Sequence, residues 1–101
     1  MKTIAISIGD INGVGLEIAI KAHSKIKSFC NPIYFINQNL LSQGAQILNA
    51  NIPADFKIYE CGENFKIHPG KISKKSGKFS FLSFKNALIF TKNAQADALV
   101  T

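Results

Sequence analysis

The chain has 101 residues, which is enough for one small domain at most. Its net charge of +6 comes from twelve lysines without any arginine, which argues against specific recognition of nucleic acid through arginine forks. Hydrophobic residues make up 47% of the chain, as in an ordinary globular protein, and no stretch approaches the ~20 apolar residues of a membrane span.

The first predicted strand covers residues 3–8 and ends at a glycine-rich loop over residues 9–17. Its isoleucines alternate with small residues, which is typical of a strand covered on both faces. A helix is predicted over residues 16–27, with Glu17 and Lys21 spaced as an i,i+4 ion pair. A strand that breaks on glycines and restarts as a helix indicates a parallel α/β unit.

The next elements continue the same alternation. Apolar runs predict strands over residues 33–36 and 56–60, and helical spacing predicts a helix over residues 38–49 between them. This order predicts a parallel sheet with right-handed crossovers. The fold class is therefore α/β, in three α/β/α layers.

The pattern changes at about residues 61–76, which have no helical period and are predicted to form an irregular insertion. Within it, residues 65–67 and 71–73 are candidates for short extended pieces. A long helix is predicted over residues 77–93, with more apolar side chains than one face can bury, so some must meet another element or a second subunit. Residues 97–101 predict a final strand, which gives the order βαβαβ(loop)αβ.

The loop over residues 9–17 has its glycines at Gly9, Gly13 and Gly15. The dinucleotide fingerprint would need a glycine at Ile18, and the lysine of a phosphate-binding loop is absent. Asp10 also brings a negative charge where a phosphate needs donors. Two hypotheses remain: a capped strand-to-helix turn without a ligand, or a ligand loop at the carboxyl end of a strand. In the second, Asp10, Gly13 and Gly15 are the candidate cofactor-binding residues.

The same loop resembles the opening G-D-P-A-G-I-G-P-E of the 4-hydroxythreonine-4-phosphate dehydrogenase family. Five positions match the pattern, namely Gly9, Asp10, Gly13, Gly15 and Glu17, whereas Ile11 and Leu16 replace its prolines. Later landmarks of that family, G-K, S-G-x-aromatic and D-A-L-V-T, are similar to residues 70–71, 76–79 and 97–101. The resemblance covers the whole chain.

The resemblance implies that residues 1–101 are the N-terminal α/β portion of a larger two-domain enzyme. The family oxidises and decarboxylates 4-phosphooxy-L-threonine in pyridoxal phosphate (vitamin B6) biosynthesis, using NAD and a divalent metal such as zinc, magnesium or cobalt. Its members are homodimers. It also implies that no catalytic residue and no metal ligand lies in this portion, so that residues 1–101 alone are expected to be inactive.

The two histidines do not indicate a metal site. His23 and His68 are far apart in the sequence, and neither matches the family's metal-binding positions. His23 flanks the apolar stripe of its predicted helix, and we expect it to be a surface or boundary residue without a role. Cys30 and Cys61 form no C-x-x-C pair, which predicts a reduced, cytoplasmic protein.

Other functions remain open. The isopropylmalate-type β-decarboxylating dehydrogenases have a related loop, G-D-G-I-G-P-E, which is two residues shorter. A non-enzymatic alternative is a basic binding module that uses the lysines at positions 66, 71, 74, 75 and 78. A third is a structural subdomain that dimerises through the phenylalanine-rich helix over residues 77–93.

Overall fold

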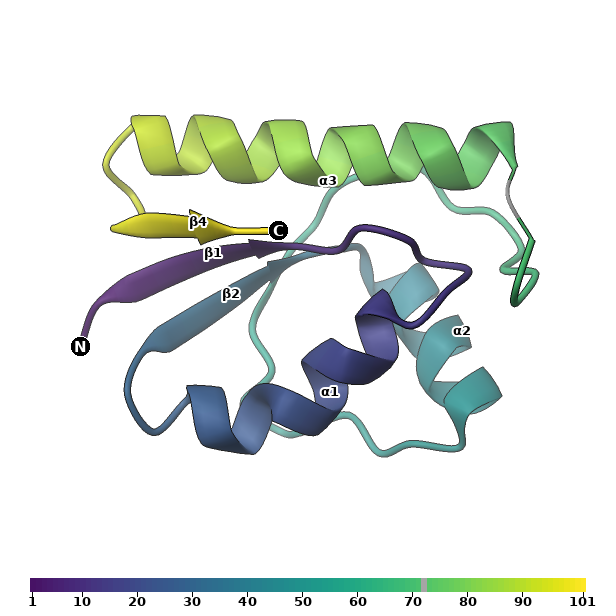
Figure 1. The fold of residues 1–101 in the computed structure, drawn as a ribbon, viewed down its shortest axis with the longest axis horizontal. Coiled ribbons are helices and arrows are strands. Elements are labelled where there is room, and N and C mark those ends of the chain that lie inside the picture. The colour runs from purple at the N-terminus through teal and green to yellow at the C-terminus, as the bar shows by residue number, and fades with distance from the viewer. Residues whose placement is uncertain (72) are drawn as a thin grey trace.

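The computed structural model of the chain describes residues 1–71 and 73–101. A four-stranded parallel sheet lies between two helices on one face and a third helix on the other (Figure 1). The predicted three-layer α/β/α class is therefore confirmed.

The elements follow the predicted order, with shifts at their ends. The bounds are β1 Thr3–Ser7, α1 Gly15–Ile26, β2 Asn31–Phe35, α2 Gln38–Leu48, β3 Ile58–Tyr59, α3 Lys74–Lys92 and β4 Ala98–Val100. The strand predicted over residues 56–60 is shorter than expected. The candidate extended piece at residues 65–67 is irregular, as are Lys71 and Ser73, and Ile72 lies outside the described residues.

The helix α3 begins three residues earlier than the predicted start at Gly77. The hydroxyl of Ser73 accepts a hydrogen bond from the Ser76 N–H, and the Ser76 hydroxyl accepts one from the Ser73 N–H, each at 3.0 Å. This reciprocal arrangement is a capping box built with serine in place of the usual glutamate. Because the predicted helix started at Gly77, the prediction left Ser73 and Ser76 in the irregular segment.

The strand order in the sheet is β3-β2-β1-β4. The chain thus builds outward from β1 to β2 and β3, and then crosses to the opposite side of β1 to form β4. Ile4 pairs with Pro32 of β2 and with Ala98 of β4, which fixes the register of the two central strands and of the last one. The order reverses between β1 and β4, so the carboxyl ends of these two strands form the topological switch point.

Two apolar cores cover the faces of the sheet. Tyr34 and Ile36 lie in the larger one with residues of α1 and α2, whereas Phe35 lies in the smaller one against Ala87 of α3. This alternation is the period of a strand with helices on both sides. On α3 the large side chains of Phe81, Phe84 and Ile89 remain 62%, 39% and 46% exposed. The expectation that part of this helix meets another element or subunit stays a prediction.

The prediction for His23 is wrong. Its side chain is buried, with 1% exposure, and packs beside the stacked rings of Tyr34 and Phe56. Its Nδ1 lies 2.8 Å from the Tyr34 hydroxyl, and its Nε2 lies 2.9 Å from Oδ1 of Asp55. Helical spacing placed His23 beside the apolar stripe, but the polar partners that allow its burial come from β2 and from the turn before β3.

Candidate functional site

The loop between β1 and α1 lies at the switch point of the sheet. Residues 8–14 leave the carboxyl end of β1, and Thr101 leaves that of β4 beside it (Figure 1). Crevices at this position hold the ligands of open parallel sheets. The sequence predicted a loop at a carboxyl edge, and the structure adds that this edge is the one where the strand order reverses.

The loop is a tight turn built around Asp10. Its Oδ1 accepts a hydrogen bond from the Asn12 N–H at 3.0 Å, and its backbone carbonyl accepts one from the Gly13 N–H at 3.1 Å. A Cβ atom on Gly13 would lie 2.5 Å from the Asp10 carboxylate, so a larger residue there would force the Asp10 side chain to move. The N-cap of α1 is Val14, without a side-chain cap.

Asn12 joins this loop to the irregular segment. Its side-chain amide donates to the Lys71 carbonyl at 2.7 Å and accepts from the His68 N–H at 3.2 Å. Its backbone carbonyl accepts from the Gly70 N–H at 2.6 Å. Asn12 is 4% exposed, so each of these bonds is partly or fully shielded from water. The position of the loop therefore depends on residues nearly sixty positions later.

Two further amides hold the same segment from α2. Gln43 donates to the Phe65 carbonyl at 2.8 Å and accepts from the Ile67 N–H at 3.0 Å, as a neighbouring strand would. Asn37 caps α2 by accepting from the Leu40 N–H, and it donates to the Cys61 carbonyl at 3.1 Å. Sequence reasoning missed these roles because isolated amide residues carry no periodic signal.

Ser83 fixes the end of β1 from the other face of the sheet. Its hydroxyl donates to the Phe35 carbonyl at 2.6 Å and accepts from the Ile8 N–H at 2.9 Å, with the side chain fully buried. One hydroxyl of α3 thus satisfies a backbone group on each of the two central strands, where their ladder ends. It also sets where the loop to α1 begins.

Two hollows flank the loop on opposite faces of the sheet. An apolar groove of about 310 Å³ lies on the α1 side, and its lining includes Gly9, Gly15, Ile18 and Val100. A polar hollow of about 170 Å³ lies toward α3 and is lined by Gly9, Asp10, Ser76, Gly77 and Ser80. Gly9 lines both. Of the predicted cofactor residues, Asp10 and Gly15 thus line these two hollows, whereas Gly13 lines a separate hollow of about 50 Å³ with residues of α2 and the irregular segment.

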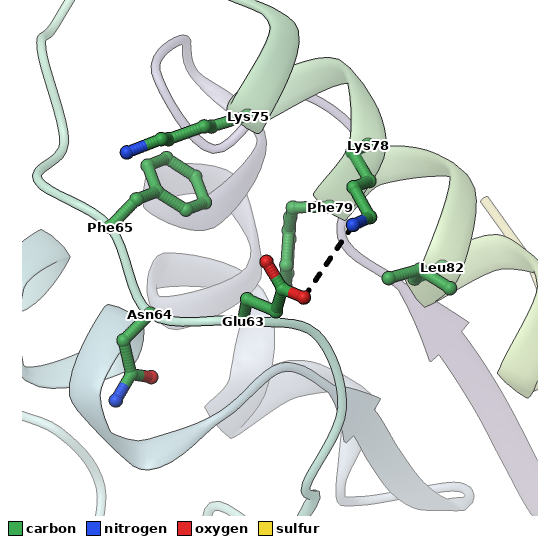
Figure 2. Close-up of a pocket in the computed structure, with 7 residues that line it drawn as sticks. All are labelled: Glu63, Asn64, Phe65, Lys75, Lys78, Phe79 and Leu82. Carbon is green, nitrogen blue, oxygen red and sulfur yellow. Dashed lines mark hydrogen bonds and ion pairs between the residues drawn. The ribbon is translucent and has the colours of Figure 1, made fainter.

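Two of the five lysines of the cluster, Lys75 and Lys78, line another hollow, of about 100 Å³, between the irregular segment and α3 (Figure 2). In Figure 2, Lys75 and Lys78 project from α3 over this hollow, and Glu63 points toward Lys78, with 3.5 Å between Nζ and Oε1. All five lysines of the cluster are exposed. Exposed lysines with one weak ion pair form an ordinary solvated surface, and no bound ligand is needed to explain it.

A polar cluster lies at the amino-terminal edge of the sheet, away from the loop. Hydrogen bonds from His23 and Lys27 hold the pKa of the Asp55 carboxyl below its usual range. Because an ionised carboxylate only accepts, His23 donates to it from Nε2, and in the neutral imidazole this leaves Nδ1 to accept from the Tyr34 hydroxyl. Burial, reinforced by the charges of Cys30 and Asp55, raises the pKa of Tyr34 to about 12.

Neither a metal centre nor a membrane helix is found in the part of the chain that the structure describes. Residues 1–71 and 73–101 contain no cluster of three or more histidine, cysteine, aspartate or glutamate side chains that fits a metal ion. Among the described helices, none is both long and apolar enough to cross a bilayer. Both cysteines are buried free thiols, and burial raises the pKa of Cys61 to about 11.

Comparisons with known proteins agree with the sequence resemblance. A Campylobacter fetus subsp. fetus protein named 4-hydroxythreonine-4-phosphate dehydrogenase is 62% identical over all 101 residues, which correspond to 33% of its length. Proteins with the same name from Sulfurimonas denitrificans and Helicobacter pylori P12 are 47% and 38% identical, over 97% and 99% of this chain and 32% and 34% of theirs. No family model matches the chain.

A solved structure has the same fold. The crystal structure of a 4-hydroxythreonine-4-phosphate dehydrogenase from Burkholderia phymatum superposes with a TM-score of 0.83 over 98% of this chain and 35% of that one, at 22% identity. The resemblance seen in the loop and the later segments is thus confirmed: residues 1–101 are homologous to 4-hydroxythreonine-4-phosphate dehydrogenases and span about a third of the length of the curated relatives they match.

Proposed function

We propose that residues 1–101 form the N-terminal portion of an NAD-dependent, metal-dependent dehydrogenase. In this proposal the complete enzyme oxidises and decarboxylates 4-phosphooxy-L-threonine in pyridoxal phosphate (vitamin B6) biosynthesis. The observation that carries it is the 62% identity over the whole chain to a protein named for that activity. Residues 1–101 belong to the first of two domains, with an insertion at about residues 61–76, and are inactive alone.

The proposed role of this portion is to bind and orient the dinucleotide at the switch point. NAD supplies a hydride acceptor when it is bound. Support comes from the two hollows, which Asp10 and Gly15 line on either side of the end of β1. Asn12 fixes the loop between them through the irregular segment. Gly13 contributes indirectly, because it lets the Asp10 side chain fold against the turn.

Residues 1–71 and 73–101 show no ligand set for the proposed metal. A catalytic divalent ion needs three or so clustered donors, and the described residues offer no such group. We therefore assign the metal ligands to parts of the enzyme outside residues 1–101 and derive no step through the metal here.

We also propose a small-molecule substrate, a homodimeric state and a cytoplasmic location for the complete enzyme. The substrate is a phosphorylated small molecule, and the lysines without arginine give no support for specific recognition of nucleic acid. A homodimer is proposed on the exposed side chains of Phe81, Phe84 and Ile89 on α3, which a second subunit would cover. A cytoplasmic location fits the two free thiols.

A chimera tests the function. The matching third of the Campylobacter fetus relative is replaced by residues 1–101, and NAD reduction is followed with 4-phosphooxy-L-threonine as substrate. We expect activity close to that of the unmodified relative, and none from residues 1–101 alone. The control is the same chimera without substrate.

A chimera that folds, as judged by its circular dichroism and its mass in solution, but reduces no NAD would contradict the proposal. Activity with isopropylmalate in place of 4-phosphooxy-L-threonine would favour the isopropylmalate-type alternative instead.

A further inference from the structure

The polar hollow between the loop and α3 has the chemistry of a sugar-hydroxyl site. Its lining brings Asp10 and Gly9 from the loop together with Ser76, Gly77 and Ser80 from α3. These residues lie more than sixty positions apart in the sequence. At about 170 Å³ the hollow is smaller than the ~300–1,000 Å³ of pockets that enclose a whole small-molecule ligand. It therefore fits one part of a ligand, of the size of a single sugar ring.

Among the described residues, the only charged side chain that lines the hollow is that of Asp10, whose carboxylate accepts hydrogen bonds and donates none. Oδ1 of Asp10 accepts from the Asn12 N–H, and within residues 1–71 and 73–101 its Oδ2 has no hydrogen-bond donor. Ser80 adds a half-buried hydroxyl, which can donate or accept. A carboxylate beside a hydroxyl suits a neutral ligand that offers hydroxyl protons, whereas a phosphate would meet a like charge.

The backbone on both sides of the hollow is open. A Cβ atom built on Gly9 or on Gly77 would have no atom within 4 Å, although Gly77 lies in the first half of α3. Glycine costs stability inside a helix, and here no close neighbour requires it. Gly77 is exposed and the space beside it is open, so a ligand could approach the hollow from the α3 side.

We infer that the polar hollow binds a vicinal diol, such as the ribose hydroxyls of a nucleoside, with Asp10 accepting the hydroxyl protons. Gly9 also lines the apolar groove on the other side of β1, where Ile18 and Val100 would contact a planar ring. A nucleoside then lies across the carboxyl edge at the switch point, its base in the groove and its sugar in the hollow. The inference rests on the proposed function, which makes NAD the ligand that carries this diol.

The test uses the 101-residue chain labelled with ¹⁵N, and the probes are adenosine and 2′,3′-dideoxyadenosine. Adenosine is expected to shift the amide resonances of Gly9, Asp10, Gly77 and Ser80. The dideoxy analogue, which lacks both hydroxyls, is expected to bind at least about tenfold more weakly, as for loss of a hydrogen bond to a charged group. Asp10→Asn, which replaces one acceptor oxygen of the carboxylate with a donor NH₂ group, is expected to weaken adenosine binding by a similar factor.

A second variant separates binding from folding. Gly77→Leu fills the hollow while improving the helix, so we expect a melting temperature at least as high as that of the wild type, but adenosine binding weakened at least about tenfold. Phe81→Leu is the matched control, since it places the same residue on an exposed position of α3 outside the hollow. It is expected to bind adenosine like the wild type.

The inference is overturned if adenosine and its dideoxy analogue bind equally, or if neither shifts these resonances. It is also overturned if inorganic phosphate shifts them and does so more strongly in Asp10→Asn, because the hollow would then be an anion site. These outcomes are independent of the chimera: loss of diol preference with an active chimera rejects the hollow alone, and an inactive chimera with diol preference intact rejects the dehydrogenase.

Discussion

The strand β2 and the irregular segment of residues 60–71 satisfy their backbone groups in different ways. In β2 the ladders to β1 and β3 use backbone partners, and the side chains alternate between two apolar cores. In the irregular segment most partners are side-chain amides, from Asn12, Asn37 and Gln43, and backbone carbonyls serve only the N–H groups of Gly70 and Lys71 among the described residues. Buried backbone groups need partners in either case. The difference is that the segment depends on single residues, whereas a ladder is shared among many.

The largest effect is expected from Ser83→Ala, where the sheet itself depends on one side chain. Removing the hydroxyl leaves the Ile8 N–H and the Phe35 carbonyl without this partner in a fully buried place. We expect the free energy of unfolding to fall by about 3 kcal/mol. Chemical denaturation measures it. Ser80→Ala, on the same helix but half-buried, is the control and is expected to change stability by less than about 1 kcal/mol.

Asn12→Ala is expected to cost about 2 kcal/mol, because two partly buried hydrogen bonds to the irregular segment are lost. The loss should appear in thermal unfolding and as faster exchange of the His68 amide. Asn64→Ala replaces an exposed asparagine of the same segment and should leave both unchanged. Equal behaviour of the two variants would mean that the segment does not depend on Asn12.

Gln43→Ala is expected to cost about 1 kcal/mol, since Gln43 is only half-buried. Its effect should be local, with faster exchange of the Ile67 amide and little change in the strands. The matched control is Gln46→Ala, an exposed glutamine of the same helix. Faster exchange throughout β2 would show that segment and sheet unfold as one unit.

Ionisation of the buried Tyr34 side chain is expected to lower the stability of the fold at alkaline pH. The pKa of Tyr34 is raised from 10.0 to about 12, so folding favours the neutral phenol. Its contribution is fully present below pH 10 and is lost as the pH rises from 10 toward 12, because the unfolded chain ionises first. Tyr34→Phe should remove this part of the alkaline loss of stability, whereas Tyr59→Phe, at an exposed position, should keep it.

The sequence predicts the parts of the structure that depend on repeating patterns, and it misses those that depend on hydrogen bonds of single residues. Apolar periodicity predicted the element order and the parallel sheet, and the i,i+4 spacing of opposite charges predicted the Glu17–Lys21 ion pair, which is present at 2.9 Å. It failed for His23, whose burial depends on Tyr34 and Asp55, two partners distant in the sequence. Hydrogen bonds between single residues and distant segments leave no periodic pattern.

The sequence predicted the loop of the candidate site, but it did not predict the distant residues that complete the site. The glycine spacing located the loop and its Asp10, both of which lie at the carboxyl edge. Neither the joining of Ser76 and Gly77 to that loop nor the anchoring by Asn12 follows from local sequence. The crossing of α3 to the far side of β1 brings them together, and it depends on the tertiary packing of the whole unit.

Native-state hydrogen exchange of the 101-residue chain tests most directly whether single amides fix the irregular segment. The amides to compare are His68 and Ile67, which donate to Asn12 and Gln43, with Tyr34 in the β2 ladder. We predict that all three are strongly protected in the wild type, and that Asn12→Ala exposes His68 while Tyr34 stays protected. Free exchange of His68 and Ile67 in the wild type would contradict the account.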